Sequence, residues 1–216
     1  MDNAVSVYLV TQADRSDGRR TSAVVREAIA GGVDVVQLRE KHASAADRYE
    51  LGRELRDLTS ASDVPLVIND RVDLAVALDA DGVHLGDDDL PVEVAREQLG
   101  PDAVVGRSVS TPDAARAAEA AGADYLGVGA VFETGTKDTR ESESEIGVDT
   151  VAAVADAVSI PIVGIGGITP ENAGRVAAAG ADGVAVVTAI TRADDPAAAT
   201  RELRAAVEAE TEAAPR

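Results

Sequence analysis

Short apolar segments recur along the chain at even intervals. Each is four to six residues long and rich in valine and isoleucine, which is typical of strands buried on both faces of a sheet. Alanine-rich stretches of helical length separate them, for example residues 113–121 and 170–179. The pattern therefore predicts eight strands that alternate with eight helices. The predicted strands are residues 5–10, 33–38, 65–68, 82–85, 104–109, 125–128, 161–165 and 184–187.

The junctions between the predicted elements repeat as well. Glycine and aspartate recur where a helix ends and the next strand begins, as in Gly122-Ala123-Asp124 and Gly180-Ala181-Asp182. Glycine is the common cap just past a helix end. A hydroxyl residue followed by proline, as in Thr111-Pro112 and Thr169-Pro170, predicts the starts of helices.

This alternation predicts an α/β fold with a parallel sheet. Eight strand-helix units can close into a (β/α)8 TIM barrel of near-minimal size. The alternative is an open doubly wound sheet, but no dinucleotide-binding fingerprint follows the first strand. We therefore predict one barrel domain over residues 1–216, with a polar C-terminal tail from about Glu208 that is expected to fray.

The composition limits the partners of the chain. The net charge is −19, with two lysines, Lys41 and Lys137, among 20 basic residues. A surface this acidic repels nucleic acid and anionic membranes, so neither is expected as a partner. Cysteine is absent, no apolar run reaches the length of a membrane span, and a cytoplasmic protein is expected. The many carboxylates and few lysines also suit very high salt, which screens self-repulsion.

Polar residues follow the predicted strands at their carboxyl ends. In a barrel these ends face one common mouth, where active sites are built. The two lysines lie after the second and sixth predicted strands, so the fold would bring them to the same mouth. The candidate site residues are Gln37, Arg39, Lys41, Asn69, Asp70, His84, Asp89, Ser108, Thr134, Thr136, Lys137, Gly167, Val187 and Thr188.

The Gly164–Ile168 segment predicts an anion site. Glycines let backbone N–H groups approach a ligand, and the helix that Thr169-Pro170 opens favours an anion at its amino end. In barrels, the loops after the seventh and eighth strands often bind phosphate. The alternative is a tight turn without a ligand.

Asp70 and Asp89 predict a divalent-cation site. They follow neighbouring strands, and Mg²⁺ prefers one or two carboxylates together with phosphate oxygens. Arg39, Lys41 and Lys137 would add positive charge around it, which suits a diphosphate. The alternatives are that Asp87–Asp89 is a solvated acidic surface and that His84 is a core residue.

Taken in this order, the motifs resemble those of the thiamine phosphate synthase family, which consists of (β/α)8 barrels. The resemblance runs from about Val5 to Pro196. The most specific motif is Thr134-Gly135-Thr136-Lys137-Asp138. The others are Gln37-Leu38-Arg39-Glu40-Lys41, Ile68-Asn69-Asp70, Val83-His84-Leu85-Gly86 and Gly164-Ile165-Gly166-Gly167-Ile168.

The resemblance implies a transferase that joins 4-amino-2-methyl-5-hydroxymethylpyrimidine diphosphate to 4-methyl-5-(2-phosphoethyl)thiazole. The products would be thiamine monophosphate and pyrophosphate. The cofactor would be Mg²⁺. By resemblance, Arg39, Lys41, Asn69 and Lys137 bind the diphosphate, Gln37 meets the pyrimidine, and Ser108 lies near the leaving group. Asp70 and Asp89 hold Mg²⁺, although Asp88 is an alternative to Asp89. Thr134, Thr136, Gly167, Val187 and Thr188 bind the thiazole phosphate.

The sequence departs from the family pattern at Asp87, where glutamine is usual. Three other functions also fit parts of the sequence. A thiazole tautomerase-like barrel would need a general acid or base, for which His84 is the candidate. A phosphosugar epimerase or isomerase would leave the Thr134–Lys137 segment unexplained. A non-catalytic binder of thiamine precursors would keep the binding residues without turnover.

Overall fold

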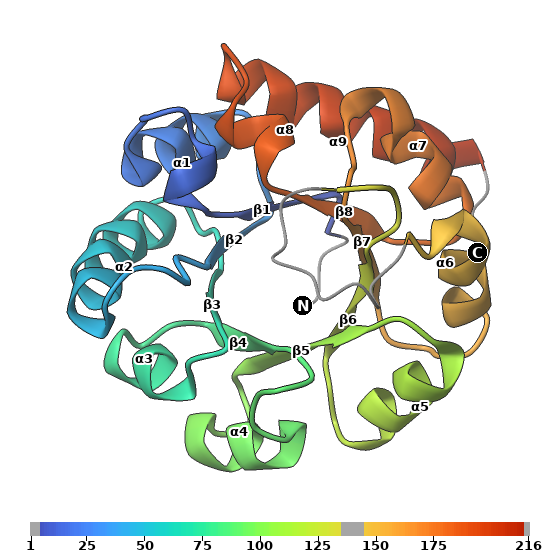
Figure 1. The fold of residues 1–216 in the computed structure, drawn as a ribbon, viewed down its shortest axis with the longest axis horizontal. Helices are drawn as coiled ribbons and strands as arrows, with labels where there is room; N and C mark the ends of the chain where they lie inside the picture. The colour runs from blue at the N-terminus through green and yellow to red at the C-terminus, as the bar shows by residue number, and fades with distance from the viewer. Residues whose placement is uncertain (1–4, 135–144, 214–216) are drawn as a thin grey trace.

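The computed structural model describes residues 5–134 and 145–213, and it contains a closed barrel of eight parallel strands. Consecutive strands pair along the whole order, and β1 pairs with β8 to close the barrel (Figure 1). The predicted (β/α)8 barrel is thus confirmed. The strands are β1 (Val7–Val10), β2 (Val35–Leu38), β3 (Leu66–Asn69), β4 (Gly82–Leu85), β5 (Val104–Val109), β6 (Tyr125–Gly129), β7 (Ile162–Ile165) and β8 (Gly183–Val186).

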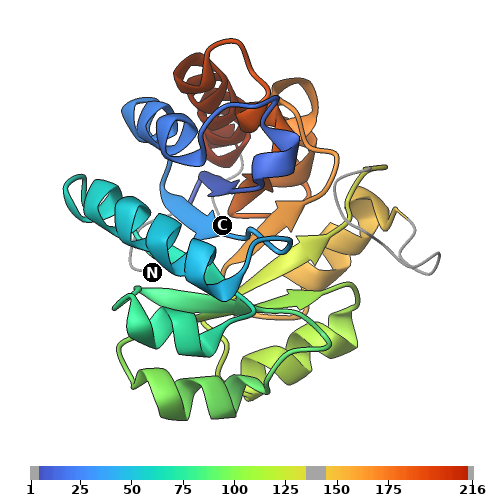
Figure 2. The same cartoon turned by 60° about the vertical axis from the view of Figure 1, so that its left-hand side comes forward.

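Helices form a ring around the outside of the strands (Figures 1 and 2). Between β8 and the last helix the structure adds a single helical turn, so the described residues hold one α-helix more than the eight predicted. The helices are α1 (Thr21–Ala30), α2 (Ala45–Ser60), α3 (Val72–Ala77), α4 (Val92–Leu99), α5 (Pro112–Ala120), α6 (Gly147–Ala155), α7 (Pro170–Ala178), α8 (Thr188–Thr191) and α9 (Pro196–Ala213), with a 3₁₀ helix, η1 (Ala13–Arg15), after β1.

The core consists of two separate clusters of apolar side chains. The larger one fills the space between the strands and the helices. The smaller one lies inside the barrel and includes Tyr8, Val35, Val67, Tyr125 and Val163. Successive residues of a strand point to opposite sides, so each strand contributes to both clusters. For this reason the strands read as continuous apolar runs in the sequence.

Four aspartates pin the strands together at their amino ends. Asp34, Asp81, Asp124 and Asp182 stand directly before the four even-numbered strands. The carboxylate of each accepts a backbone N–H bond of 2.6 to 2.9 Å from the start of the preceding strand. The N–H of each aspartate donates back to a carbonyl of that strand at 2.8 to 2.9 Å. We call these four residues the aspartate clamps, and they lie at the end of the barrel opposite to its mouth.

Arginines from the helix layer bind three of the clamps. Arg56 of α2 contacts Asp81 at 2.5 Å, and Arg96 of α4 contacts Asp124 at 2.5 Å. Arg204 of α9 pairs with Asp34. Each guanidinium therefore ties a helix to the strand pair that its aspartate joins.

The last helix, α9, continues to Ala213, past the point where the polar tail was expected to begin, and the expected fraying stays a prediction. Val207 is buried, Arg204 Nη1 lies 2.8 Å from Glu208 Oε1, and the Thr211 hydroxyl donates to the Val207 carbonyl at 3.1 Å. One buried residue and these local bonds are enough to extend the helix through a polar sequence. None of the described helices is both long and apolar enough to cross a bilayer.

Replacing Asp81 with alanine should lower the free energy of unfolding by about 1–3 kcal/mol, because the Leu66 N–H loses its acceptor and Arg56 its partner. Urea unfolding followed by circular dichroism measures the loss. Asp57→Ala is the matched control, since Asp57 is exposed on α2 beside Arg56, and it should change the stability by less than about 0.5 kcal/mol. Equal losses in the two variants would contradict the clamp.

Candidate active site

A cavity of about 460 Å³ opens at the carboxyl ends of the strands. The fold brings together most of the predicted residues there. Its wall includes Gln37, Arg39, Asn69, His84, Ser108, Thr134, Gly167, Val187 and Thr188. Thr136 and Lys137 lie outside the described residues.

Hydrogen bonds between polar side chains cross the barrel interior along the cavity wall. The amide nitrogen of Gln37 donates to the Tyr8 hydroxyl at 2.8 Å, and that hydroxyl lies 2.8 Å from the Tyr125 hydroxyl. The Tyr125 hydroxyl lies 2.9 Å from Nδ1 of His84, whose Nε2 lies 2.9 Å from Oγ of Ser108. His84 is therefore part of a polar network that faces the cavity, rather than an apolar core residue.

Glycines on β5 and β6 make room for this network. A Cβ at Gly106 would lie 2.2 Å from Cζ of Tyr125, and one at Gly127 would lie 2.9 Å from Cε1 of His84. Any larger residue would displace the phenol or the imidazole. The small residues of β5 and β6 thus allow two large polar rings inside an eight-stranded barrel.

Burial raises the pKa of Tyr8 to about 12, against the opposing effect of its hydrogen bonds to Tyr125 and Gln37. Burial also raises the pKa of Tyr125 well above its ordinary value, and the neighbouring Tyr8 raises it further. Both phenols are about 1% exposed. Both are therefore neutral at physiological pH.

The buried side chain of Glu40 anchors the segment after β2. Glu40 is buried and accepts hydrogen bonds from the Ala13 N–H at 2.8 Å and the Thr21 hydroxyl at 3.3 Å. Arg39, its neighbour, faces the cavity and donates to the Gln12 side chain at 3.0 Å. The alternation of an extended chain thus places a structural carboxylate behind two cations, Arg39 and Lys41.

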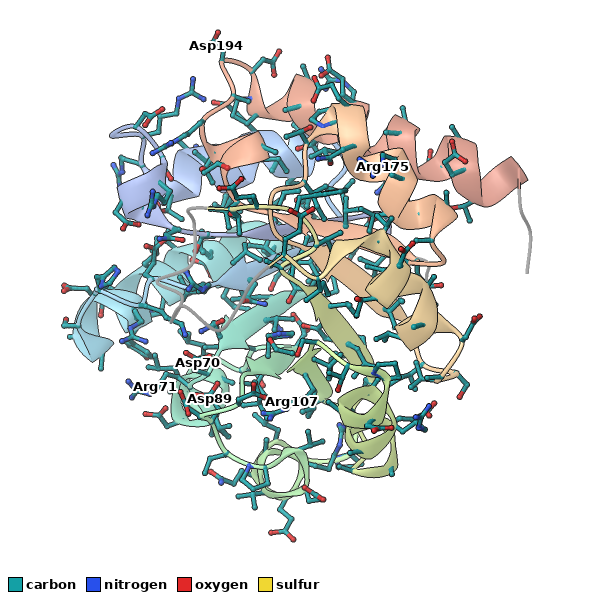
Figure 3. All side chains as sticks on the ribbon, turned by 45° about the vertical axis from the view of Figure 1, so that its right-hand side comes forward. Asp70, Arg71, Asp89, Arg107, Arg175 and Asp194 are labelled. Atoms are coloured by element: carbon teal, nitrogen blue, oxygen red, sulfur yellow. The ribbon has the colours of Figure 1, made fainter. Side chains whose placement is uncertain are left out.

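Asp70, Asp89 and Lys41 form a charged group beside the cavity. Lys41 Nζ lies 2.9 Å from Asp70 Oδ2, and the Gly86 N–H donates to Asp89 Oδ2 at 2.6 Å. Burial raises the pKa of Asp89, and the nearby carboxylate of Asp70 adds to the rise, whereas Gly86 N–H and Lys41 oppose it. Figure 3 shows Asp70 and Asp89 close together; Asp70 directly follows β3, and Asp89 lies in the connection after β4. Asp88, in contrast, is exposed.

This carboxylate pair suits a divalent cation. Two carboxylates held close enough to raise a pKa repel each other, and a cation between them would relieve that repulsion. In the described part of the chain no group of three or more carboxylate or imidazole ligands occurs. A cation here would need further oxygen ligands from water or from a phosphorylated substrate.

The glycine segment after β7 lies across the barrel from these carboxylates. Gly167 has a φ of +64°, and a Cβ there would lie 2.5 Å from the Glu133 carbonyl oxygen. The Asn172 side chain donates to the Gly167 carbonyl at 3.0 Å and accepts from the Thr169 N–H at 2.9 Å. The loop is thus held by α7, which begins just after it. Thr188 is the first residue of the short helix α8, which follows the next strand, β8.

Two arginines of the cavity wall were not predicted from the sequence. Arg15 belongs to η1, and Arg192 follows α8, where its Nε lies 3.3 Å from Asp17 Oδ1. The Thr191 hydroxyl donates to the Arg15 carbonyl at 2.6 Å, so the two segments are joined. A count of strand-end residues misses them because both lie in connections. The two tyrosines were missed because they lie within apolar strands.

The aspartate at position 87, where glutamine was expected, pairs with an arginine. Its side chain is 88% exposed and lies 3.0 Å from Arg107 Nη2. Arg107 also donates to the Gly86 carbonyl. This arginine therefore offsets the charge that Asp87 adds near the mouth.

Comparisons with known proteins identify the family. A family profile described as thiamine monophosphate synthase matches residues 7–190. This chain belongs to the thiamine monophosphate synthase family. A thiamine-phosphate synthase of Natronomonas pharaonis is 67% identical over 208 residues, covering 96% of this chain and 97% of the relative. One of Haloarcula marismortui is 66% identical over 203 residues, covering 94% and 96%.

A solved structure of the same family agrees with the fold. The thiamine phosphate pyrophosphorylase from Pyrococcus furiosus superposes with a TM-score of 0.87 at 41% identity, covering 96% of this chain and 98% of that chain. The function predicted from the resemblance, a transferase that makes thiamine phosphate, is confirmed at the level of the family. The individual roles of the site residues stay predictions.

The raised tyrosine pKa values predict a loss of stability in alkali. Between pH 10 and about 12 the unfolded chain releases the Tyr8 proton and the folded protein keeps it, so the unfolded state binds fewer protons. The free energy of unfolding should therefore fall as pH rises through this interval. Tyr8→Phe should reduce the slope by up to about 1 kcal/mol per pH unit. Urea unfolding at a series of pH values measures it, and identical slopes would contradict the assignment.

Proposed function

We propose that this member of the thiamine monophosphate synthase family condenses 4-amino-2-methyl-5-hydroxymethylpyrimidine diphosphate with 4-methyl-5-(2-phosphoethyl)thiazole. The products are thiamine monophosphate and pyrophosphate. The observation that carries the proposal is that two regions suited to phosphate face one cavity from opposite sides. Arg39 and Asn69 line one side, with Lys41 next to the cavity through its ion pair with Asp70, and the Gly167 loop lines the other.

The reaction needs charge stabilisation more than a protein nucleophile. The C–O bond between the pyrimidine methylene and the diphosphate breaks, and its electron pair leaves with the diphosphate oxygen. The thiazole nitrogen then donates its lone pair to the electron-poor methylene carbon. Cations and hydrogen-bond donors around the leaving group lower the barrier of such a step.

The residues divide between the two substrates. Arg39, Lys41, Asn69 and Lys137 bind the diphosphate, and Ser108 donates to it. Gln37 meets the pyrimidine. Thr134, Thr136 and Gly167, with Val187 and Thr188, bind the thiazole phosphate. Asp70 and Asp89 would hold Mg²⁺, which supplies Lewis-acid stabilisation of the leaving diphosphate when bound.

Release of pyrophosphate from the two substrates tests the proposal directly. The purified protein should release pyrophosphate only when both substrates and Mg²⁺ are present. A tautomerase-like enzyme would act on the thiazole phosphate alone, and a non-catalytic binder would release nothing. Either outcome would overturn the synthase assignment. The expected cytoplasmic location stays a prediction.

Asp89→Asn should lower the Mg²⁺-dependent rate by about 100-fold, because the variant loses one of two carboxylates beside the leaving group. Asp88→Asn is the matched control, since Asp88 is adjacent in sequence and exposed, and it should retain nearly the full rate. Initial rates over a Mg²⁺ series measure both variants. The reverse result would assign the metal to Asp88.

We also propose that the acidic surface adapts this chain to high salt. The net charge of −19 repels itself at low ionic strength, and a Debye length of ~3 Å at 1 M salt removes most of that repulsion. The midpoint of thermal unfolding should therefore rise by at least a few degrees between low and molar KCl. A midpoint that does not rise would defeat this proposal.

A further inference from the structure

Five polar side chains form one unbroken hydrogen-bonded chain along the cavity wall. They come from five different strands, and all four links measure 2.8 or 2.9 Å. In order the residues are Gln37, Tyr8, Tyr125, His84 and Ser108. The two ends, Gln37 and Ser108, are the residues that the proposed function assigns to the pyrimidine and to the leaving diphosphate. The chain therefore joins two parts of one substrate site through the protein.

With His84 as a neutral imidazole, the protons along this hydrogen-bonded chain all point the same way. Each phenol has one proton and a neutral imidazole has one, so each residue accepts from one neighbour and donates to the other. The structure places the amide nitrogen of Gln37 against the Tyr8 hydroxyl. Tyr8 then donates to Tyr125, Tyr125 donates to Nδ1 of His84, and Nε2–H of His84 donates to Ser108. The Ser108 proton is left to point into the cavity.

The opposite direction has a different consequence. If the Gln37 amide turned its oxygen toward Tyr8, every link would reverse, and Ser108 would donate to Nε2 of His84. Its hydroxyl could then no longer donate to a ligand. The orientation of one amide thus decides whether a serine at the other end of the chain is a donor to the substrate.

We propose that this hydrogen-bonded chain couples recognition of the pyrimidine at Gln37 to the ability of the Ser108 hydroxyl to donate a hydrogen bond to the substrate. Tyr8, Tyr125 and His84 are positioning residues, which transmit the orientation of the Gln37 amide as a direction of hydrogen bonding. The inference rests on the proposed function, because Ser108 needs a departing diphosphate to stabilise.

The direction in the structure suits the chemistry at both ends. It leaves the amide oxygen of Gln37, an acceptor, for the 4-amino group of the pyrimidine. It leaves the hydroxyl of Ser108, a donor, for the oxygen on which negative charge develops. No proton moves along the chain, and the electron pair of the breaking C–O bond leaves with the diphosphate. The raised pKa values of Tyr8 and Tyr125 keep both phenols protonated.

A double-mutant cycle between Tyr125 and Ser108 tests the coupling. Tyr125→Phe removes the central hydroxyl, and with it two of the four links, and keeps both ends. It should lower kcat by about 10- to 100-fold and change KM for the pyrimidine diphosphate by less than about threefold. Ser108→Ala should lower kcat by about 100-fold. The double variant should lose no more than Ser108→Ala alone, because Tyr125 acts only through Ser108.

Three results would overturn the inference. The losses could multiply in the double variant, in which case Tyr125 acts independently of Ser108. Tyr125→Phe could keep the wild-type kcat. Both of these results leave the proposed function intact, because the wild-type protein still releases pyrophosphate. A wild-type protein that releases none would overturn the function and the inference together.

A second pair of variants checks the same idea at His84. In His84→Gln the amide oxygen can accept from Tyr125 and the amide nitrogen can donate to Ser108, so the direction is preserved. His84→Leu has neither group. We expect kcat of His84→Gln to be at least about 10-fold above that of His84→Leu, with both variants folded by circular dichroism. Equal kcat values would overturn the coupling.

Discussion

The aspartate clamps at the amino ends of the strands fix the register on which the active site depends. Most of the strands have only four residues, so few ladder bonds hold each one in place. A slip by one residue would turn every side chain of a strand to the other face. Because each clamp both accepts from and donates to the neighbouring strand, it selects one register for that pair. Tyr8, Gln37 and His84 then all point to the barrel interior.

Several basic side chains gather at the mouth of this acidic protein. The chain as a whole is strongly acidic, yet Arg15, Arg39 and Arg192 face one cavity, and Lys41 lies beside it. Arginine and lysine serve different needs here, since a planar guanidinium fixes an orientation and an ammonium follows a moving oxygen. A local excess of positive charge within an acidic protein concentrates phosphorylated ligands at this place.

The barrel could be predicted from the sequence because strand and helix periods differ so clearly. The predicted strands agree with the structure to within two residues at each end. The inward-facing residues could not be predicted in the same way. A strand buried on both faces has no polar-apolar alternation, so the sequence does not distinguish Tyr8 and Tyr125 from residues that face the helices. Arg15 and Arg192 could not be assigned to the cavity from the sequence, because no periodicity describes the path of the connections in which they lie.

Contacts between residues that are distant in the sequence could not be predicted either. The glycine-aspartate junctions predicted helix ends, but Asp34 bonds to residues 27 and 28 positions earlier, and nothing local signals such a pairing. The same holds for the ion pair of Lys41 with Asp70. Strand-end counting placed both residues at one mouth, and only the closed barrel shows that they touch.

The buried tyrosines also bear on whether the electrophilic substrate carbon reacts with the protein. A methylene carbon that loses diphosphate becomes a strong electrophile, and a phenolate in the cavity wall would be a nucleophile that could attack it. Raising the pKa of Tyr8 from 10 to about 12 lowers its phenolate fraction at neutral pH about a hundredfold. The chain also has no cysteine. The neutral, mutually bonded tyrosine hydroxyls therefore compete little with the incoming thiazole nitrogen for that carbon.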